Sequence, residues 1–220
     1  MDSNYEDDYH KTLHGHLYQS KEYYELRAKL AYLNYFKGLK DIKDRKILEF
    51  GCGLGQNLYW LSKIGVNVEG YDISEFALNF CRKKGLKVTS KFSKLGKFDV
   101  IFSRHVFEHL KNPFEILSKL KDRLNKKGIL IIVLPYERHE RADFAPDIHR
   151  HLYCWNFRTI NNLLDEAGYR VVKNELLPFA MGYKKLAFTS RINMKLYDSL
   201  TKFIGRMRGA RELMVIAGVK

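Results

Sequence analysis

Glycine occupies every second position of the short segment 51–55, which directly follows the apolar run Lys46–Phe50. Glycine adopts positive φ angles without strain and allows a ligand to approach the bare backbone. The next residues, 56–63, space their apolar side chains as a helix does. A strand, a glycine turn and a helix N-terminus present free N–H groups and the positive end of a helix dipole. This arrangement predicts a binding site of nucleotide size.

A carboxylate, Asp72, stands about 20 residues beyond this turn and ends a second predicted strand, 67–71. In a doubly wound fold, an acid at this place accepts hydrogen bonds from the ribose hydroxyls of a bound nucleoside. The alternative is that Asp72 only caps the helix that we expect to begin near Ser74.

The spacing of the glycines argues against two kinds of phosphate site. An NAD site carries Gly-x-Gly-x-x-Gly, whereas this chain has Gly-x-Gly-x-Gly followed by Gln56 and Asn57. The chain also lacks the Gly-Lys-Ser/Thr of a P-loop. A nucleoside ligand without phosphate fits these residues better.

The rest of the chain alternates between predicted strands and predicted helices. Further strands are predicted at 86–89, 98–103, 128–135 and 169–177, with helices at 20–38, 56–64, 74–84, 113–125 and 156–168. The run 128–135 is apolar without a break, which is typical of a strand buried on both faces. Such alternation predicts an α/β fold with a parallel sheet covered on both sides by helices.

Three segments, in order and with matching spacing, resemble the first, second and fourth motifs of class I S-adenosylmethionine-dependent methyltransferases: 47–55, 69–74 and 98–103. The segment 151–168 is similar to the ending of the small-molecule branch that includes the ubiquinone-pathway enzymes. The resemblance implies S-adenosylmethionine as cofactor. It also implies a Rossmann-like, seven-stranded, mostly parallel sheet with helices on both faces and an antiparallel last strand.

The resemblance assigns residues to the methionine end of the cofactor. Glu49 is expected to face the ammonium group of the cofactor, directly or through water. The turn and the end of the strand 98–103 are expected to line the methionine part with the following residues: Gly51, Cys52, Gly53, Ser103, Arg104 and His105.

The ribose and the adenine have their own expected partners. The resemblance implies that Asp72 holds the ribose hydroxyls and that Ile73 lies against the adenine. Phe92 is the candidate for the other adenine face, because a ring stacks favourably on a base. The family often places an aspartate near this point, whereas this chain offers Ser90 or a backbone carbonyl to the adenine amine.

The stretch from His105 to His109 matches His-x-x-Glu-His, a zinc-peptidase pattern. It directly follows a predicted buried strand, and no third ligand stands at a recognisable spacing. Similar Glu-His pairs occur at this place in the methyltransferase family. We therefore expect no metal here and a structural hydrogen bond for His109.

Residues 135–155 are expected to face the methyl acceptor, because ligands of open parallel sheets bind beyond the carboxyl ends of the strands. A hydroxyl acceptor must lose its proton, and histidine is suited to remove it near neutral pH. His149 is the first candidate for this base and His151 the second. They are alternatively loop residues bonded to backbone, or ligands of a divalent ion together with Asp143 and Asp147.

Two flanking segments are predicted to determine specificity. Residues 1–45 are expected to form a tyrosine-rich helical lid on a core of residues 46–220. An insertion at about 179–209 carries a basic amphipathic helix over 192–207. This helix is packed on the core, forms a dimer contact, or lies on a membrane surface that carries a lipid-linked substrate.

Composition sets the outer limits. The 220 residues carry a formal net charge of +14, and residues 181–220 hold nine basic residues against two acidic ones. Such asymmetry marks an acidic substrate, nucleic acid or a membrane, or only a soluble lysine-rich surface. The acidic N-terminus is unlike a secretory signal, no run is long enough to span a membrane, and three cysteines suit free thiols. These features predict a cytoplasmic protein.

The sequence thus predicts a methyltransferase that acts on an O or N nucleophile of a small molecule, with acidic and lipid-linked acceptors as candidates. One alternative is a nucleic-acid methyltransferase, which only the charge favours. Against it, the strand 98–103 runs into Ser-Arg-His rather than the Asn/Asp-Pro-Pro-Tyr/Phe of base-methylating enzymes. Another is a module that binds the cofactor without turnover. The oligomeric state stays open.

Overall fold

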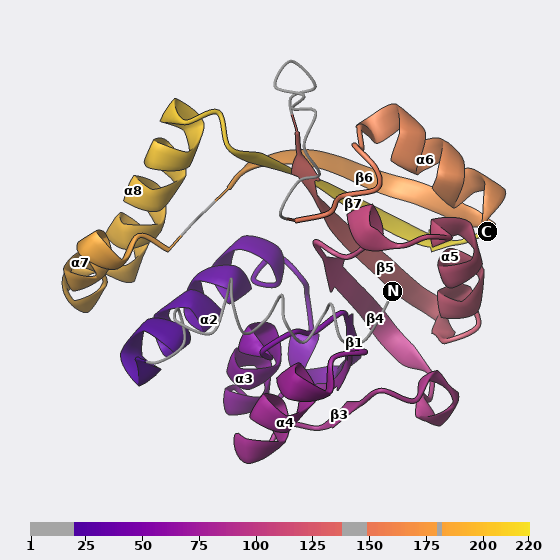
Figure 1. Ribbon diagram of the computed structural model, residues 1–220, viewed down its shortest axis with the longest axis horizontal. Coiled ribbons are helices and arrows are strands. Elements are labelled where there is room, and N and C mark those ends of the chain that lie inside the picture. Colours follow the sequence, from indigo (N-terminus) through magenta and orange to yellow (C-terminus); the bar gives the residue numbers. More distant parts are fainter. Residues whose placement is uncertain (1–19, 138–148, 180–181) are drawn as a thin grey trace.

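The computed structural model describes residues 20–137, 149–179 and 182–220, and within them seven strands form one sheet (Figure 1). The strands are β1 (Lys46–Phe50), β2 (Asn67–Tyr71), β3 (Val88–Thr89), β4 (Phe98–Arg104), β5 (Leu124–Tyr136), β6 (Tyr169–Pro178) and β7 (Arg211–Val219). Their order is β3-β2-β1-β4-β5-β7-β6, and only β7 runs antiparallel to its neighbours. The predicted Rossmann-like sheet with an antiparallel last strand is confirmed.

Helices cover both faces of this sheet (Figure 1). They are α2 (Lys21–Tyr35), α3 (Gln56–Lys63), α4 (Glu75–Lys83), α5 (Pro113–Lys121), α6 (Phe157–Glu166), α7 (Ala187–Ile192) and α8 (Met194–Met207). On β5, Leu130 and Ile132 pack with α5 and α6, whereas Ile131 and Val133 pack with α2 and α3. Side chains alternate across a strand, so an unbroken apolar run fills two cores at once.

The predicted helix starts lie where side chains cap them. The Ser74 hydroxyl accepts from the Ala77 N–H at the start of α4, and Asn156 and Thr159 form a capping box on α6. The predicted helices at 20–38 and 113–125 are shorter in the structure, and two strands also differ from their predicted bounds. Strand β3 holds only two residues, and β5 begins at Leu124 rather than at Gly128, because Leu124 pairs with Phe98 before a bulge shifts the register.

The segment between β6 and β7 holds α7 and α8, which stand beside α2 (Figure 1). The Tyr23 hydroxyl of α2 donates to the Gly182 carbonyl, and Asn34 Nδ2 donates to Asp198 Oδ1 of α8 at 3.3 Å. The α8 helix buries one side, through Tyr197, Thr201 and Gly205. Among the described residues, none of the helices combines the length and the apolar character that a bilayer-spanning helix needs.

Candidate functional site

The glycine turn lies between β1 and α3, and its three glycines all have positive φ: 77° at Gly51, 48° at Gly53 and 71° at Gly55. A Cβ on Gly51 would stand 2.2 Å from Val106 Cγ2, and one on Gly55 would stand 2.6 Å from Cys81 Sγ. Both positions therefore require glycine for packing as well as for backbone conformation. The turn packs closely against Val106, two residues beyond β4, and against α4.

Asp72 follows β2 and is buried beside this turn. Its Oδ2 accepts from the Gly53 N–H at 2.7 Å, and its Oδ1 accepts from the Ser74 N–H at 3.0 Å. Each carboxylate oxygen has two lone pairs, so both can still accept from a hydroxyl. Ser74 itself caps α4, so that helix does not depend on Asp72 for its cap.

Glu49 is buried near the end of β1. Its Oε1 accepts from Asn57 Nδ2 at 2.5 Å, whereas its Oε2 has no hydrogen-bond partner among the described residues. Burial raises the pKa of Glu49 to about 8, against the lowering effect of Asn57 and Arg104. A buried carboxylate with one free oxygen suits a cation, so the predicted partner of an ammonium group fits this place.

The other residues predicted to line the cofactor site differ in burial and in packing. The Ser103 hydroxyl is fully buried and, within the described residues, has no hydrogen-bond partner. The Cys52 side chain packs with Leu58 and Cys81, so only its backbone is available to a ligand. Ile73 and Phe92 are half-buried, and the Phe92 ring meets Tyr71 edge-on at 5.7 Å between centroids.

Arg104 pairs with Glu212, a residue that the sequence did not lead us to expect at this site. Its guanidinium donates through Nε to Glu212 Oε1 at 2.9 Å, and the Tyr35 hydroxyl donates to Glu212 Oε2 at 2.6 Å. Although burial opposes it, Arg104 and His105 lower the pKa of Glu212 to about 2. The signal was available, because Glu212 is the one acid inside the otherwise apolar run of β7.

His105 has a left-handed backbone, with φ of 54°, and its Nε2 lies 2.8 Å from Glu212 Oε1. Burial and the charge of Arg104 lower the pKa of His105. The short 3-10 turn Phe107–His109 follows. His105 and His109 therefore do not share the face of an α-helix, which the zinc-peptidase pattern requires.

The two candidate bases precede α6. His151 Nδ1 lies 2.5 Å from Glu137 Oε1, and Glu137 directly follows β5. His149 is exposed, and its ring centroid lies 5.6 Å from that of His151. The structure brings together both histidines and a carboxylate that the sequence analysis did not single out. Asp143 and Asp147 lie outside the described residues.

A small cleft opens between α2, the start of α3 and the end of β4. Its lining combines cationic, amide and apolar side chains: Arg27, Leu30, Ala31, Asn34, Tyr35, Gln56 and Arg104. Arg104 thus touches both the Glu212 pair and the cleft. A cleft with two guanidinium groups suits an anionic ligand group.

Comparison with known proteins decides the family. Residues 18–174 match the family described as "Methyltransferase domain". The chain belongs to this methyltransferase family. The prediction of a methyltransferase domain that uses S-adenosylmethionine is thereby confirmed. The unpartnered Glu49 oxygen and the Asp72 cradle are the observed features of this methyltransferase that fit the cofactor.

Curated relatives match only a part of their own length. The tRNA U34 carboxymethyltransferase of Actinobacillus succinogenes is 30% identical over 130 residues, which are 53% of this methyltransferase and 40% of that protein. The protein of the same name from Mannheimia succiniciproducens is 34% identical over 107 residues, 43% of this chain and 33% of that protein. The chain spans no more than two fifths of either relative.

Solved structures share the fold over the whole chain. A SAM dependent methyltransferase from Archaeoglobus fulgidus has a TM-score of 0.62 at 22% identity, covering 96% of this chain and 99% of that one. Magnesium protoporphyrin IX methyltransferase from Synechocystis PCC 6803 has a TM-score of 0.63 at 15% identity and covers both chains fully. At these identities the likeness concerns the fold.

Proposed function

We propose that this methyltransferase transfers a methyl group from S-adenosylmethionine to an O or N nucleophile of a small acidic molecule. The observation that carries the cofactor half of this proposal is the pair Glu49 and Asp72. These buried carboxylates lie near the ends of the neighbouring strands β1 and β2, and each retains lone pairs for a ligand. Glu49 suits the ammonium group and Asp72 suits the ribose hydroxyls.

The chain's own residues would bind and orient the reactants. The cofactor supplies a sulfonium methyl group that is open to displacement. Holding the nucleophile about 3 Å from that methyl group is the main contribution of the protein. The backbone of the glycine turn, with Ser103 and His105, would line the methionine part, while Ile73 and Phe92 would flank the adenine.

We propose a histidine before α6 as the base for a hydroxyl acceptor. His151 is paired with Glu137, and a carboxylate partner fixes the orientation of the imidazole ring. His149 lies next to it and is exposed to solvent. A base at this place would contribute a factor of roughly 10²–10⁴ to the rate.

The acidic character of the acceptor is proposed from the cleft beside α2. Arg27 and Arg104 line it, with Asn34 and Gln56 as further donors. A carboxylate or phosphate group would pair with these guanidinium groups. Residues 1–45, which include α2, would then act as a lid over the reactants. The function would be that of the small-molecule branch of the family.

We also propose that the insertion at 179–209 lies on an anionic membrane surface. Large apolar side chains of α7 and α8 point outward: Phe188, Ile192, Leu196, Phe203 and Met207. The same segment, 184–208, carries seven basic residues: Lys184, Lys185, Arg191, Lys195, Lys202, Arg206 and Arg208. These side chains lie on α7, on α8 and on the short turn before α7. Exposed apolar and basic side chains on amphipathic helices are typical of binding in the plane of a membrane interface. The acceptor would then be lipid-linked.

A second candidate acceptor is RNA. Both curated relatives described above are named for tRNA, and the formal net charge of +14 suits a polyanion. Transfer of a radiolabelled methyl group to a metabolite or lipid extract, and not to total tRNA, would support the small acceptor. The opposite result would replace it with RNA. With the acceptor identified, His149→Ala and His151→Ala variants that both retain full turnover would exclude a histidine base.

A further inference from the structure

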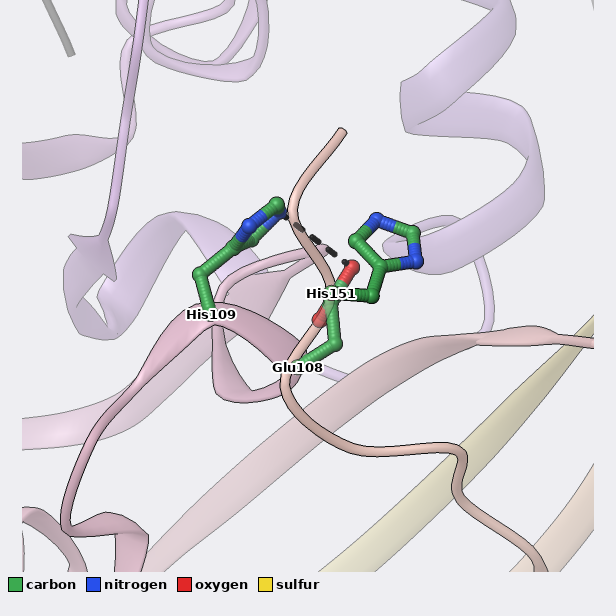
Figure 2. A group of neighbouring side chains, drawn as sticks. All are labelled: Glu108, His109 and His151. Atoms are coloured by element: carbon green, nitrogen blue, oxygen red, sulfur yellow. Dashed lines mark ion pairs between the residues drawn. The ribbon is translucent and has the colours of Figure 1, made fainter. Parts of the chain in front are cut away.

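Three metal-ligating side chains from two separate segments converge beyond the ends of β4 and β5 (Figure 2). Glu108 and His109 belong to the turn Phe107–His109, and His151 belongs to the segment that leads into α6. Their ligand atoms all lie within 4.8 Å of one another. A backbone hydrogen bond of 2.7 Å, from the Leu152 N–H to the Glu108 carbonyl, joins the two segments.

Glu108 is the unusual member of this group. Its side chain is fully buried, and neither carboxylate oxygen has a hydrogen-bond partner among the described residues. The closest ion-pairing nitrogen is His109 Nε2, at 3.9 Å from Oε1. Arg104 pairs with Glu212 through Nε and Nη2, at 2.9 and 2.8 Å from Oε1, and no ion pair joins it to Glu108 among the described residues. A buried carboxylate without partners is costly, and burial raises the pKa of Glu108 to about 8. A bound cation would stabilise its ionised form.

His151 is oriented as a metal ligand would be. Its Nδ1 lies 2.5 Å from Glu137 Oε1, which leaves Nε2 for another partner. Histidine ligands of metals almost always donate their other ring N–H to a carboxylate or carbonyl, which fixes the tautomer and raises the basicity of the ligand nitrogen. The His109 ring meets the His151 ring edge-on, at 4.8 Å between centroids.

We propose that Glu108, His109 and His151 bind a divalent transition-metal ion, with Zn²⁺ as the ion to test first. Two imidazoles and a carboxylate form a common zinc ligand set, whereas Mg²⁺ and Ca²⁺ prefer oxygen ligands alone. This site differs from the zinc-peptidase pattern, because His151 takes the place of His105. Three protein ligands leave a coordination position open.

The side chains need only a small contraction. Zn²⁺ holds its nitrogen and oxygen ligands at about 2.0–2.2 Å, which separates tetrahedral ligand atoms by about 3.4 Å. The observed separations reach 4.8 Å, so rotation of the Glu108 and His109 side chains must bring the ligand atoms closer. With the ion bound, His151 could not act as the base, and His149 would be the histidine base that remains. The ion would itself lower the pKa of an acceptor hydroxyl in the open position, a consequence that rests on the proposed function.

The test is metal binding by the full-length, untagged protein, freed of metal with a chelator. We expect about one Zn²⁺ to bind per chain. Co²⁺ bound in its place should show the visible absorption of a four-coordinate ion. Glu108→Gln and His151→Ala should each weaken Zn²⁺ binding at least tenfold. Glu115→Gln, an exposed glutamate on α5, is the matched control and should bind as the parent does.

Further variants keep the test decisive. His10, His14 and His16 also offer imidazoles, so a variant with all three changed to glutamine must retain the ion. If Glu108→Gln fails to fold, Glu137→Gln should still weaken binding by about 10–100-fold through His151. A parent protein that binds no Zn²⁺, or unchanged affinity in the Glu108 and His151 variants, overturns the proposal. Because the readout is binding, a failure of the proposed methyl transfer leaves this result interpretable.

Discussion

The backbone N–H of Gly53 donates to Oδ2 of Asp72 at 2.7 Å, which ties the glycine turn after β1 to the end of β2. The Asp72 carboxylate is therefore fixed before any ribose binds. We expect Asp72→Ala to raise the dissociation constant of S-adenosylmethionine at least tenfold in calorimetry, a loss of about 1.4 kcal/mol. Asp72→Asn should also weaken binding, because an amide offers fewer acceptor sites to the two hydroxyls.

The matched control is Ser74→Ala. It removes the α4 cap and should lower the free energy of unfolding by about 1 kcal/mol, with little change in cofactor affinity. Equal cofactor affinity in Asp72→Ala and the parent would show that Asp72 has only a structural role.

Glu49 predicts proton release when the cofactor binds. Its pKa of about 8 means that it is mainly protonated at pH 7, and the cofactor's ammonium group would favour the ionised form. Calorimetry in buffers of different ionisation enthalpy should show release of about one proton at pH 7. Glu49→Gln should release none and bind the cofactor more weakly. Proton release that persists in Glu49→Gln would assign it to another group.

Removing the charge of Glu212 should lower the stability of the protein strongly. Glu212→Gln leaves Arg104 buried without its carboxylate, so we expect the free energy of unfolding at pH 7 to fall by about 3 kcal/mol. The folded pKa of about 2 lies below the ordinary 4.5. The stabilisation is therefore complete above pH 4.5 and is lost as the pH falls towards 2.

Urea denaturation at pH 7 and pH 3 measures this effect. The difference between Glu212→Gln and the parent should shrink at pH 3. Glu175→Gln, which removes an exposed partner of Lys173, should change stability by less than about 0.5 kcal/mol. A Glu212 variant that is as stable as this control would mean that the Arg104 pair adds nothing.

The α8 surface predicts binding to anionic vesicles. Phe203→Asp and Met207→Asp each place a charge on an exposed apolar side chain and should weaken co-sedimentation with phosphatidylserine vesicles at least tenfold. Phe114→Asp, at an exposed site on α5, should bind as the parent does. Binding should weaken with added salt. No vesicle binding, with a dimer that Phe203→Asp dissociates, would favour the dimer contact instead.

Local signals explain what the sequence could predict. The glycine turn, Asp72 and the cap at Ser74 lie within one β-α-β unit, where residue type and spacing determine the backbone. The apolar run 128–135 predicts burial on both faces, because each face of its strand needs a core. The fold class followed from such units and from the resemblance.

Contacts between distant segments explain what it could not. Tyr35, Arg104 and Glu212 come from three elements that only the sheet order brings together. The same holds for Glu108 and His151, which are 43 positions apart in the sequence. A motif search pairs His109 with His105 because they are near in sequence. The left-handed backbone at His105 instead directs it to Glu212.

The hydrogen bonds from Tyr23 to Gly182 and from Asn34 to Asp198 join α2 to the segment between β6 and β7. Helix α2 and the α7–α8 segment therefore form one unit, although more than 140 residues separate them. A chimera that exchanges only one of them with a relative would break both contacts. Acceptor preference should therefore be transferable between such enzymes only when α2 and the α7–α8 segment are exchanged together, while the sheet and its cofactor residues are kept.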